Sequence, residues 1–477
     1  MILRCTLFKK ESATIFISSK FSKKYKILIV IDRTSQIDLF ASYIIKLHEA
    51  DFEIHLAINP NINFNSFNHF LELYNLSEYL NISTEKRITK KFDVISKNNF
   101  YSFYRYSLLH ILKFPAFKFF HVNLVRSIFS MLLLKRFIRR TLLFSKYKWI
   151  LLPTDVTSFT TSWVKYGNQM GIKTAVIPWC LSDNAIQLVV PKKKLNSFVY
   201  FIYVRLLNRF YPAQLKLNVF NEYITTNSFP EILLGFMFNL KPTNPWVVCG
   251  GEAGYVFTEN QHAANFYRDS IPQKTIVHGS FSTDFESYLQ SVIHDENYEV
   301  RKHLCDLYGF DIDRPILALA APKYNFIKGL INSDLLSETA VIEEIVRILH
   351  CFTDQILVSI HPDRDDYNVW RVKNVLVTNL PLSNFVAGVD LLVASASASF
   401  SLALARGICC VDILIEDSFF ESAGSIYSSE KYIFVRSWKV FEDLMSSNDW
   451  INRIQLRRTI DSQFLKNIDY IVSYLVR

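Results

Sequence analysis

The sequence has little of what marks disordered, fibrous or disulfide-bonded proteins. Only 12 of its 477 residues are glycine and 14 are proline, which argues against a disordered or collagen-like chain. Its seven cysteines include no Cys-x-x-Cys pair and form no cluster with histidine, so neither a disulfide framework nor a zinc site is expected. This pattern fits a reducing compartment, where cysteine is mostly a small buried hydrophobic residue.

Long uncharged hydrophobic runs are also missing. No stretch of about 18 apolar residues is free of charge, so no transmembrane helix is expected. Residues 1–24 contain an apolar patch of only about four residues and no small-residue cleavage site, so no secretory signal is expected. Half of the residues are hydrophobic, which suffices for ordinary cores, and two large domains are the simplest division of this length.

Acidic residues are absent from one long segment. Residues 94–154 contain no aspartate or glutamate but eleven lysines and arginines, among dense phenylalanine and leucine. A second basic and aromatic stretch lies within residues 192–240. The segment is either a buried helical pair with basic ends or a surface on anionic lipid, where each basic group adds about 1 kcal/mol. Because its charges alternate with apolar residues, nucleic acid is not the expected partner despite the net charge of +9.

The rest of the chain alternates between strand and helix patterns. Apolar runs of strand length occur at 26–31, 52–58, 149–152, 174–177, 246–249 and 275–277. After a polar, helical stretch at 285–313, further strands are expected at 315–319, 356–360, 375–377, 390–393 and 408–414. This alternation is typical of parallel sheets covered by helices. We therefore expect an α/β protein of two Rossmann-like doubly wound domains, 1–290 and 291–477, with the basic-aromatic region inserted in the first.

Two expected strands of the second domain end in polar groups. One runs into His361 and Pro362, and proline must end a strand because it has no N–H for the ladder. The other runs into the alternating serines Ser395, Ser397 and Ser399. Ligands of open parallel sheets bind beyond the carboxyl ends of the strands. We therefore interpret the two motifs as one site for a phosphorylated ligand.

Each motif also has a simpler explanation. His361 and Pro362 are compatible with a solvated loop and turn. The three serine hydroxyls lie on one side if the chain stays extended, whereas Ser397 or Ser399 is the N-cap if a helix starts there. Either arrangement offers a phosphate hydrogen-bond donors. Lys323, just after the first strand of this domain, is placed to meet a diphosphate.

Two carboxylates of the first domain are candidate general bases. Glu252 lies in the glycine-rich segment 250–254, which we interpret as a strand-to-helix turn, although the glycines could be ordinary turn residues. Asp155 follows a strand and could instead cap the next helix. No Asp-x-Asp pair follows a strand, so no metal site is expected, and the acidic run 363–366 is interpreted as a solvated turn.

Two Rossmann-like domains with a linker near the middle resemble a GT-B glycosyltransferase. The His-Pro motif followed by a serine-rich motif is similar to bacterial sialyl-, polysialyl- and Kdo transferases of capsule and lipopolysaccharide synthesis. The resemblance implies that His361, Pro362 and the serines hold the cytidine monophosphate part of a CMP-sugar. These families take their base from an Asp/Glu-Asp/Glu-Gly triplet, for which Glu252-Ala253-Gly254 and Asp155 are the nearest candidates here.

The run at 275–284 resembles the hinge strand of surface-polysaccharide GT-B proteins. That strand often reads Gly-x-Pro-x-x-Asp, and the proline is absent here. His278 and Asp284 are therefore assigned to an interdomain hinge and not to chemistry.

The resemblance implies an inverting, metal-independent glycosyltransferase that needs no cofactor. It would move a sugar, for example a nonulosonic acid or Kdo-type residue, from a CMP-sugar to a membrane-associated glycan or glycolipid. Its expected location is cytoplasmic, peripheral on the inner face of the cell membrane. The alternatives are a CDP-glycerol-type phosphotransferase, a UDP-sugar transferase on the same fold, or a non-catalytic GT-B-like component of polysaccharide assembly.

Overall fold

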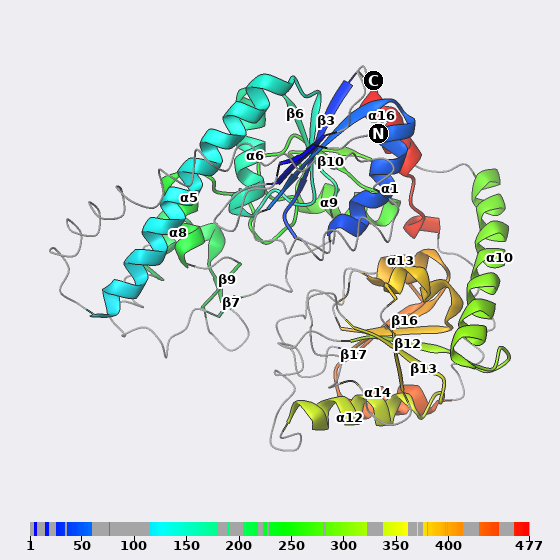
Figure 1. Ribbon diagram of the computed structural model, residues 1–477. Coiled ribbons are helices and arrows are strands. Elements are labelled where there is room, and N and C mark those ends of the chain that lie inside the picture. The colour runs from blue at the N-terminus through cyan, green and yellow to red at the C-terminus, as the bar shows by residue number, and fades with distance from the viewer. Residues whose placement is uncertain are drawn as a thin grey trace.

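The chain forms two α/β domains with helices on both faces of each sheet, as the sequence predicted (Figure 1). The computed structural model describes residues 4–6, 15–18, 25–33, 36–59, 76, 115–178, 188–189, 204–205, 207–217, 223–226, 229–279, 283–321, 337–360, 370, 375–378, 380–395, 397, 399–413, 429–447 and 462–476.

The sheet of the first domain has eight strands in the order β1-β2-β4-β3-β5-β6-β10-β11. β1 and β2 run antiparallel at one edge, and the other six are parallel. The strands are β1 (Arg4–Thr6), β2 (Ile15–Ser18), β3 (Tyr25–Ile31), β4 (Phe52–Ile58), β5 (Trp149–Leu152), β6 (Lys173–Val176), β10 (Tyr255–Phe257) and β11 (Thr275–Val277). The helices are α1 (Gln36–Glu49), α5 (Pro115–Ser145), α6 (Ser158–Gln169), α8 (Phe229–Met237), α9 (Gln261–Ser270) and α16 (Ile468–Val476).

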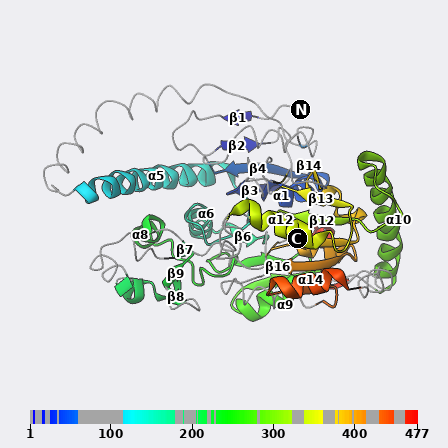
Figure 2. The same cartoon turned by 90° about the horizontal axis from the view of Figure 1, so that it is seen from below.

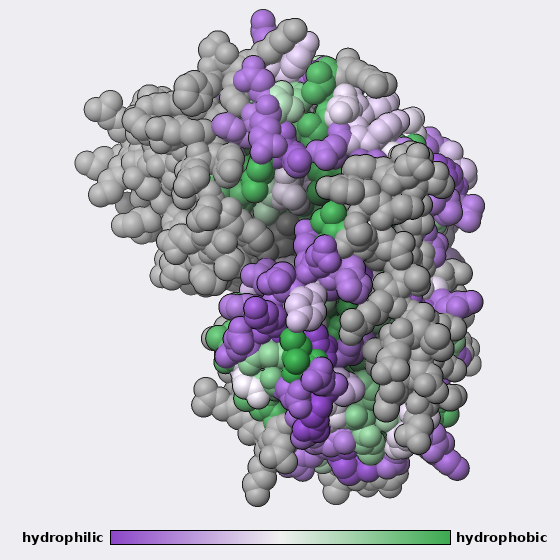
Figure 3. Space-filling model, turned by 90° about the vertical axis from the view of Figure 1, so that its right-hand side faces the viewer, coloured by the Kyte–Doolittle hydropathy of each residue, from purple (hydrophilic) through white to green (hydrophobic). Residues whose placement is uncertain are grey.

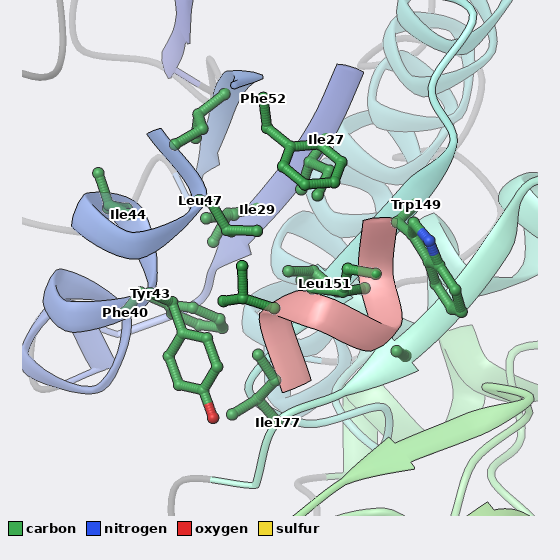
Figure 4. Close-up of a cluster of buried hydrophobic side chains, with 14 of the residues drawn as sticks. Ile27, Ile29, Phe40, Tyr43, Ile44, Leu47, Phe52, Trp149, Leu151 and Ile177 are labelled. Atoms are coloured by element: carbon green, nitrogen blue, oxygen red, sulfur yellow. The ribbon is translucent and has the colours of Figure 1, made fainter. Parts of the chain in front are cut away.

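The alternation of side chains along β3 divides the core of this domain into two layers. Ile27, Ile29 and Ile31 pack with α1 and α16, and Figure 4 shows α16 lying across this cluster. Leu28 and Val30 pack in the opposite layer with α5, α6 and α9. Because successive side chains of a strand point to opposite faces, one apolar run anchors helices on both sides of the sheet.

The second domain has six parallel strands in the order β14-β13-β12-β15-β16-β17. The strands are β12 (Leu317–Ala320), β13 (Ile356–Ser359), β14 (Leu376–Thr378), β15 (Leu391–Ala394), β16 (Cys409–Ile413) and β17 (Tyr432–Val435). The helices are α12 (Glu338–Leu349), α13 (Ser399–Ala405) and α14 (Trp438–Ser446), with short 3₁₀ turns η2 (Leu382–Asn384) and η3 (Val386–Gly388). Numbered along the chain, the order is 3-2-1-4-5-6, which places the topological switch point between β12 and β15.

Two segments connect the domains. The long helix α10 (Thr283–Tyr308) leads into the second domain, and Figure 3 shows hydrophilic side chains gathered along the side that carries it. The chain returns through η6 (Ser462–Phe464), after which α16 packs against α1. The predicted division at 290/291 therefore falls within α10. Residues 468–476, assigned to the second domain from sequence, pack in the core of the first.

The strand predicted at 246–249 is a turn. Its apolar residues pack in the layer of α6, and β10 begins only at Tyr255. The Asn244 N–H donates to the Gly250 carbonyl oxygen, and the Gly250 N–H donates to that of Val247, both at 2.8 Å. A Cβ on Gly250 would lie 1.7 Å from the Asn244 carbonyl oxygen, so glycine is required here. The prediction was wrong because a short apolar run does not distinguish a strand from a buried turn.

The basic-aromatic region contributes α5 and a small antiparallel sheet of β7 (Leu188–Val189), β9 (Tyr223–Thr225) and β8 (Lys216–Leu217). Helix α5 contacts α6 and α8, and Figure 2 shows it extending beyond the main sheet with α8 beside it. Residues 94–114 and the aromatic run 198–203 lie outside the described residues. Of the helices that the structure describes, none combines the length and the apolarity needed to cross a membrane.

Candidate functional site

The carboxyl edges of the two sheets border the same region between the domains. The Asn467 N–H donates to the carbonyl oxygen of Glu259, just beyond β10, at 2.7 Å. Phe464 packs in the core that contains α13, the helix after β15, and its ring centroid lies 4.7 Å from that of His262. The segment 462–467 therefore joins the carboxyl edge of one sheet to that of the other (Figure 1).

The serine motif lies at the switch point of the second sheet. β15 ends at Ala394 and its parallel neighbour β12 ends at Ala320. Ser395, Ser397 and Ser399 follow β15 directly, and all three are partly exposed. The strand order thus places these serines where ligands of doubly wound sheets bind.

A helix starts within the serine motif, so the extended alternative is not the one observed. Helix α13 begins at Ser399, whose N–H donates to the Ser397 Oγ at 3.2 Å. The Phe400 N–H also donates to the Ser397 carbonyl oxygen, at 3.3 Å. Ser397 therefore closes the turn that starts the helix, and Ser395 and Ser399 flank it.

The other predicted donor-site residues lie outside the described residues. β13 ends at Ser359, shortly before His361 and Pro362, and β12 ends at Ala320, shortly before Lys323. The Ala321 N–H donates to the Ser359 carbonyl oxygen at 2.8 Å, so the two strand ends are held side by side. The roles of His361, Pro362 and Lys323 stay predictions.

Asp155 is fully buried and forms an ion pair. Its Oδ1 accepts the Gly251 N–H at 2.8 Å, and its Oδ2 accepts the Ala253 N–H at 3.0 Å and the Lys274 Nζ at 2.5 Å. The Lys274 side chain is only 4% exposed, so the pair is shielded from water. Thr157, and not Asp155, is the N-cap of α6. Asp155 therefore fastens the glycine-rich loop to the segment that leads into α6.

Glu252 is exposed but lies at the amino edge of the first sheet. Its loop precedes β10, and the N–H of Thr275, the first residue of β11, donates to the Gly254 carbonyl oxygen at 3.2 Å. The Asn168 Nδ2, near the end of α6, donates to the Glu252 carbonyl oxygen at 3.0 Å. The predicted strand-to-helix turn is thus a loop that leads into a strand, opposite the carboxyl edge.

The switch point of the first sheet carries a polar cluster that was not predicted. From β3 the chain passes through α1 to β4 on one side and later returns to β5 on the other. Asp32 directly follows β3, and the Asn59 Nδ2, beyond β4, donates to the Asp32 Oδ1 at 2.6 Å. Gln36, the first residue of α1, accepts the N–H groups of Asp32 and Arg33 with its Oε1 at 2.9 and 3.0 Å. The signal was present in the sequence, because Asp32 follows a buried strand as directly as His361 does.

His278 follows β11 beside the returning helix. Neither of its ring nitrogens has a hydrogen-bond partner among the described residues, and burial together with Arg268 lowers the pKa of its imidazole. A Cβ on the next residue, Gly279, would lie 2.3 Å from the Tyr470 Cγ of α16. The end of β11 is therefore in close contact with α16, while the side chain of Asp284 lies outside the described residues.

Cys249 is a buried neighbour of the Asp155–Lys274 pair. Burial raises the pKa of its thiol well above the usual range, and Asp155 raises it further. The thiol is therefore neutral at physiological pH. Among the described residues, no three histidine, cysteine, aspartate or glutamate side chains come together as metal ligands.

No protein-family model and no curated protein matches the chain. Among solved structures it is similar to the UDP-GlcNAc 2-epimerase from Neisseria meningitidis bound to UDP-GlcNAc, with a TM-score of 0.50, 12% identity, and coverage of 94% of this chain and 98% of that one. The S. aureus MnaA–UDP structure is matched at a TM-score of 0.46 and 8% identity over 95% of both chains. Acinetobacter baumannii MurG is matched at a TM-score of 0.43 and 9% identity over 95% of this chain and 99% of that one. The chain therefore has the GT-B fold of two Rossmann-like domains.

Proposed function

We propose that the chain is a glycosyltransferase that moves a sugar from a nucleotide sugar, with CMP as the leading nucleotide, to a membrane-associated glycan or glycolipid. One observation carries the proposal: each sheet has polar residues at its switch point, and the carboxyl edges of both sheets border one interdomain region. Such an arrangement suits a reaction between two substrates, one bound by each domain.

The donor belongs to the second domain in this proposal. Ser395 and Ser399 flank the start of α13 and offer hydroxyl donors to a phosphate. His361 and Lys323, which follow the neighbouring strands, add a ring N–H and an ammonium group, and Pro362 ends its strand. Together they would stabilise the negative charge that develops on the leaving phosphate, so the transfer needs no metal ion.

The acceptor belongs to the first domain, where a carboxylate must take the hydroxyl proton. Asp155 is occupied by two backbone N–H groups and Lys274, so we assign it the role of holding the glycine-rich loop. Glu252 is exposed to solvent and stays a candidate, although it lies at the amino edge.

Membrane contact is proposed for the surface formed by α5, α8 and the residues before η1 (Pro212–Gln214). We call it the α5–α8 patch and define it by the exposed apolar side chains of Leu132 (49%), Phe210 (49%), Phe236 (45%) and Met237 (52%). The rings of Phe210 and Phe236 lie 5.6 Å apart, and the Lys241 Nζ lies 4.2 Å from the Phe236 ring. Arg136 and Arg209 are exposed nearby in the chain. Apolar side chains beside cations suit the inner, anionic face of a cell membrane.

The donor is tested with free nucleotides. Isothermal titration of CMP, CDP, UMP and UDP should show the cytidine nucleotides binding more tightly than the uridine ones. His361→Ala should weaken CMP binding at least tenfold, and Ser395→Ala should weaken it about fivefold, the loss of one hydrogen bond. Equal or tighter binding of UMP would contradict the cytidine assignment and favour a UDP-sugar donor.

The membrane contact is tested by sedimentation with vesicles. The protein should sediment with phosphatidylglycerol vesicles at low salt and not with pure phosphatidylcholine. The double variant Phe236→Ser/Met237→Ser should lose sedimentation. Leu307→Ser is the matched control, because Leu307 is similarly exposed (53%) but lies on α10. An equal loss in both variants, or no loss in either, would refute the α5–α8 patch.

A further inference from the structure

The cluster at the switch point of the first sheet has the chemistry of a binding site. Asp32 and Asn59 follow adjacent parallel strands, and the Asn59 N–H donates to the Ile31 carbonyl oxygen at 2.8 Å. Asp32 is partly exposed, whereas Gln36 is only 1% exposed. Asp32 therefore lies partly exposed at the carboxyl edge of the sheet, in a turn that the buried Gln36 amide holds.

The two polar atoms of the Gln36 amide differ: the oxygen is hydrogen-bonded, and the nitrogen has no partner among the described residues. Its Oε1 accepts two backbone N–H groups, which fixes the orientation of the amide. Its buried Nε2 has no hydrogen-bond partner among the described residues. A buried donor left unpaired costs free energy, and this one belongs to the turn that carries Asp32, because the same amide accepts the Asp32 N–H.

A partly exposed carboxylate selects the chemistry of the ligand. A hydroxyl group can give its hydrogen to the Asp32 carboxylate. A phosphate cannot donate in this way and would be repelled by the carboxylate.

We propose that Asp32 binds a sugar hydroxyl of the acceptor and accepts its proton, and that Gln36 holds the turn that carries Asp32. The step rests on the proposed function. The hydroxyl oxygen forms a bond to the anomeric carbon of the donor sugar while the bond from that carbon to the phosphate oxygen breaks. The electron pair of the broken bond stays on the phosphate, and the proton passes to the Asp32 carboxylate. Asn59, through its bond to the Asp32 Oδ1, is a positioning residue.

The inference is tested by binding before activity. The wild-type chain is titrated at millimolar concentration with a panel of methyl glycosides and short oligosaccharides, with CMP present or absent. At least one glycan should bind, and CMP should not compete with it. Asp32→Asn should weaken that binding at least tenfold, because it keeps the shape of the side chain and removes the charge.

Glu49→Gln is the matched control, because it neutralises an exposed carboxylate at the end of α1 opposite Gln36. It should leave glycan binding within twofold, and all variants should keep the wild-type CMP affinity. With a donor and acceptor that react, Asp32→Asn should lower kcat by about 100-fold or more. Glycan binding that is absent, competed by CMP or unchanged in folded Asp32→Asn would overturn the inference. Failure of the wild type to bind any nucleotide would instead contradict the proposed function.

Discussion

The two switch points differ in the charge that they present. The second sheet offers the neutral hydroxyls of Ser395 and Ser399, whereas the first offers the Asp32 carboxylate with the Gln36 and Asn59 amides. Hydroxyls donate to a phosphate, and a carboxylate repels one. In the proposed function, this difference assigns a phosphate-bearing donor to the second domain and a hydroxyl-bearing acceptor to the first.

The domains also differ in how they use a buried ion pair. In the first, the Asp155 carboxylate is the hub, because it accepts two loop N–H groups as well as Lys274. In the second, the Arg301 guanidinium is the hub, since it donates to three carbonyl oxygens as well as to Asp390 at 2.7 Å. Both ion pairs hold loops in place. In the first pair the Asp155 carboxylate makes the additional hydrogen bonds described above, and in the second the Arg301 guanidinium makes them.

The largest expected effect is on the free energy of unfolding, when the aspartate of each ion pair is replaced by alanine. Asp155→Ala should lower the free energy of unfolding by about 3–5 kcal/mol, because it leaves Lys274 buried and two loop N–H groups unpaired. Asp390→Ala should cost less, about 1–3 kcal/mol, since Arg301 keeps its carbonyl partners. Urea denaturation of both variants measures the difference. Equal losses would show that the two pairs contribute in the same way.

A smaller effect tests whether the Asp155 hub needs a glycine beside it. A Cβ on Gly251 would lie 2.0 Å from the Asp155 carbonyl oxygen, so Gly251→Ala must displace the loop and should cost about 1–3 kcal/mol. Gly254→Ala is the matched control in the same loop, because its Cβ would meet nothing nearer than 4.0 Å. That variant should stay within about 0.5 kcal/mol of the wild type. Thermal melting compares them, and similar melting temperatures would refute the close contact at Gly251.

Local patterns in the sequence predicted helices and strands. They could not predict contacts between residues that are far apart in the chain. Gly171 and Gly407, which follow α6 and α13, have positive φ angles of 70° and 75°, a conformation in which glycine commonly ends a helix. The role of Asp155 could not be predicted, because its partner Lys274 lies 119 residues away and lysine carries no positional signal. Asp32 could have been found from the rule applied to His361, since the acid directly follows a buried strand. The sequence therefore locates strand ends well, but not which strand ends meet.

The smallest expected effect is a dependence of stability on pH that differs between the domains. Burial raises the pKa of Glu53 on β4, but hydrogen bonds and charges of His55 and Lys26 lower it more, so the net pKa lies below the usual range. Ionised Glu53 thus stabilises the folded chain above the unfolded pKa of about 4.3, and this contribution is lost as the pH falls through the lower folded pKa. In the second domain, hydrogen bonds from Arg347 lower the pKa of Glu344, whose side chain is 26% exposed, so solvent weakens its contribution.

Glu53→Gln should therefore reduce the loss of unfolding free energy between about pH 6 and pH 3 more than Glu344→Gln does. Urea denaturation at both pH values measures these losses. The two variants match in chemistry and differ in burial, because Glu53 lies in the sheet core and Glu344 on the surface of α12. If wild type and Glu53→Gln lost the same free energy on acidification, the buried network of Glu53, His55 and Lys26 would contribute nothing through ionisation.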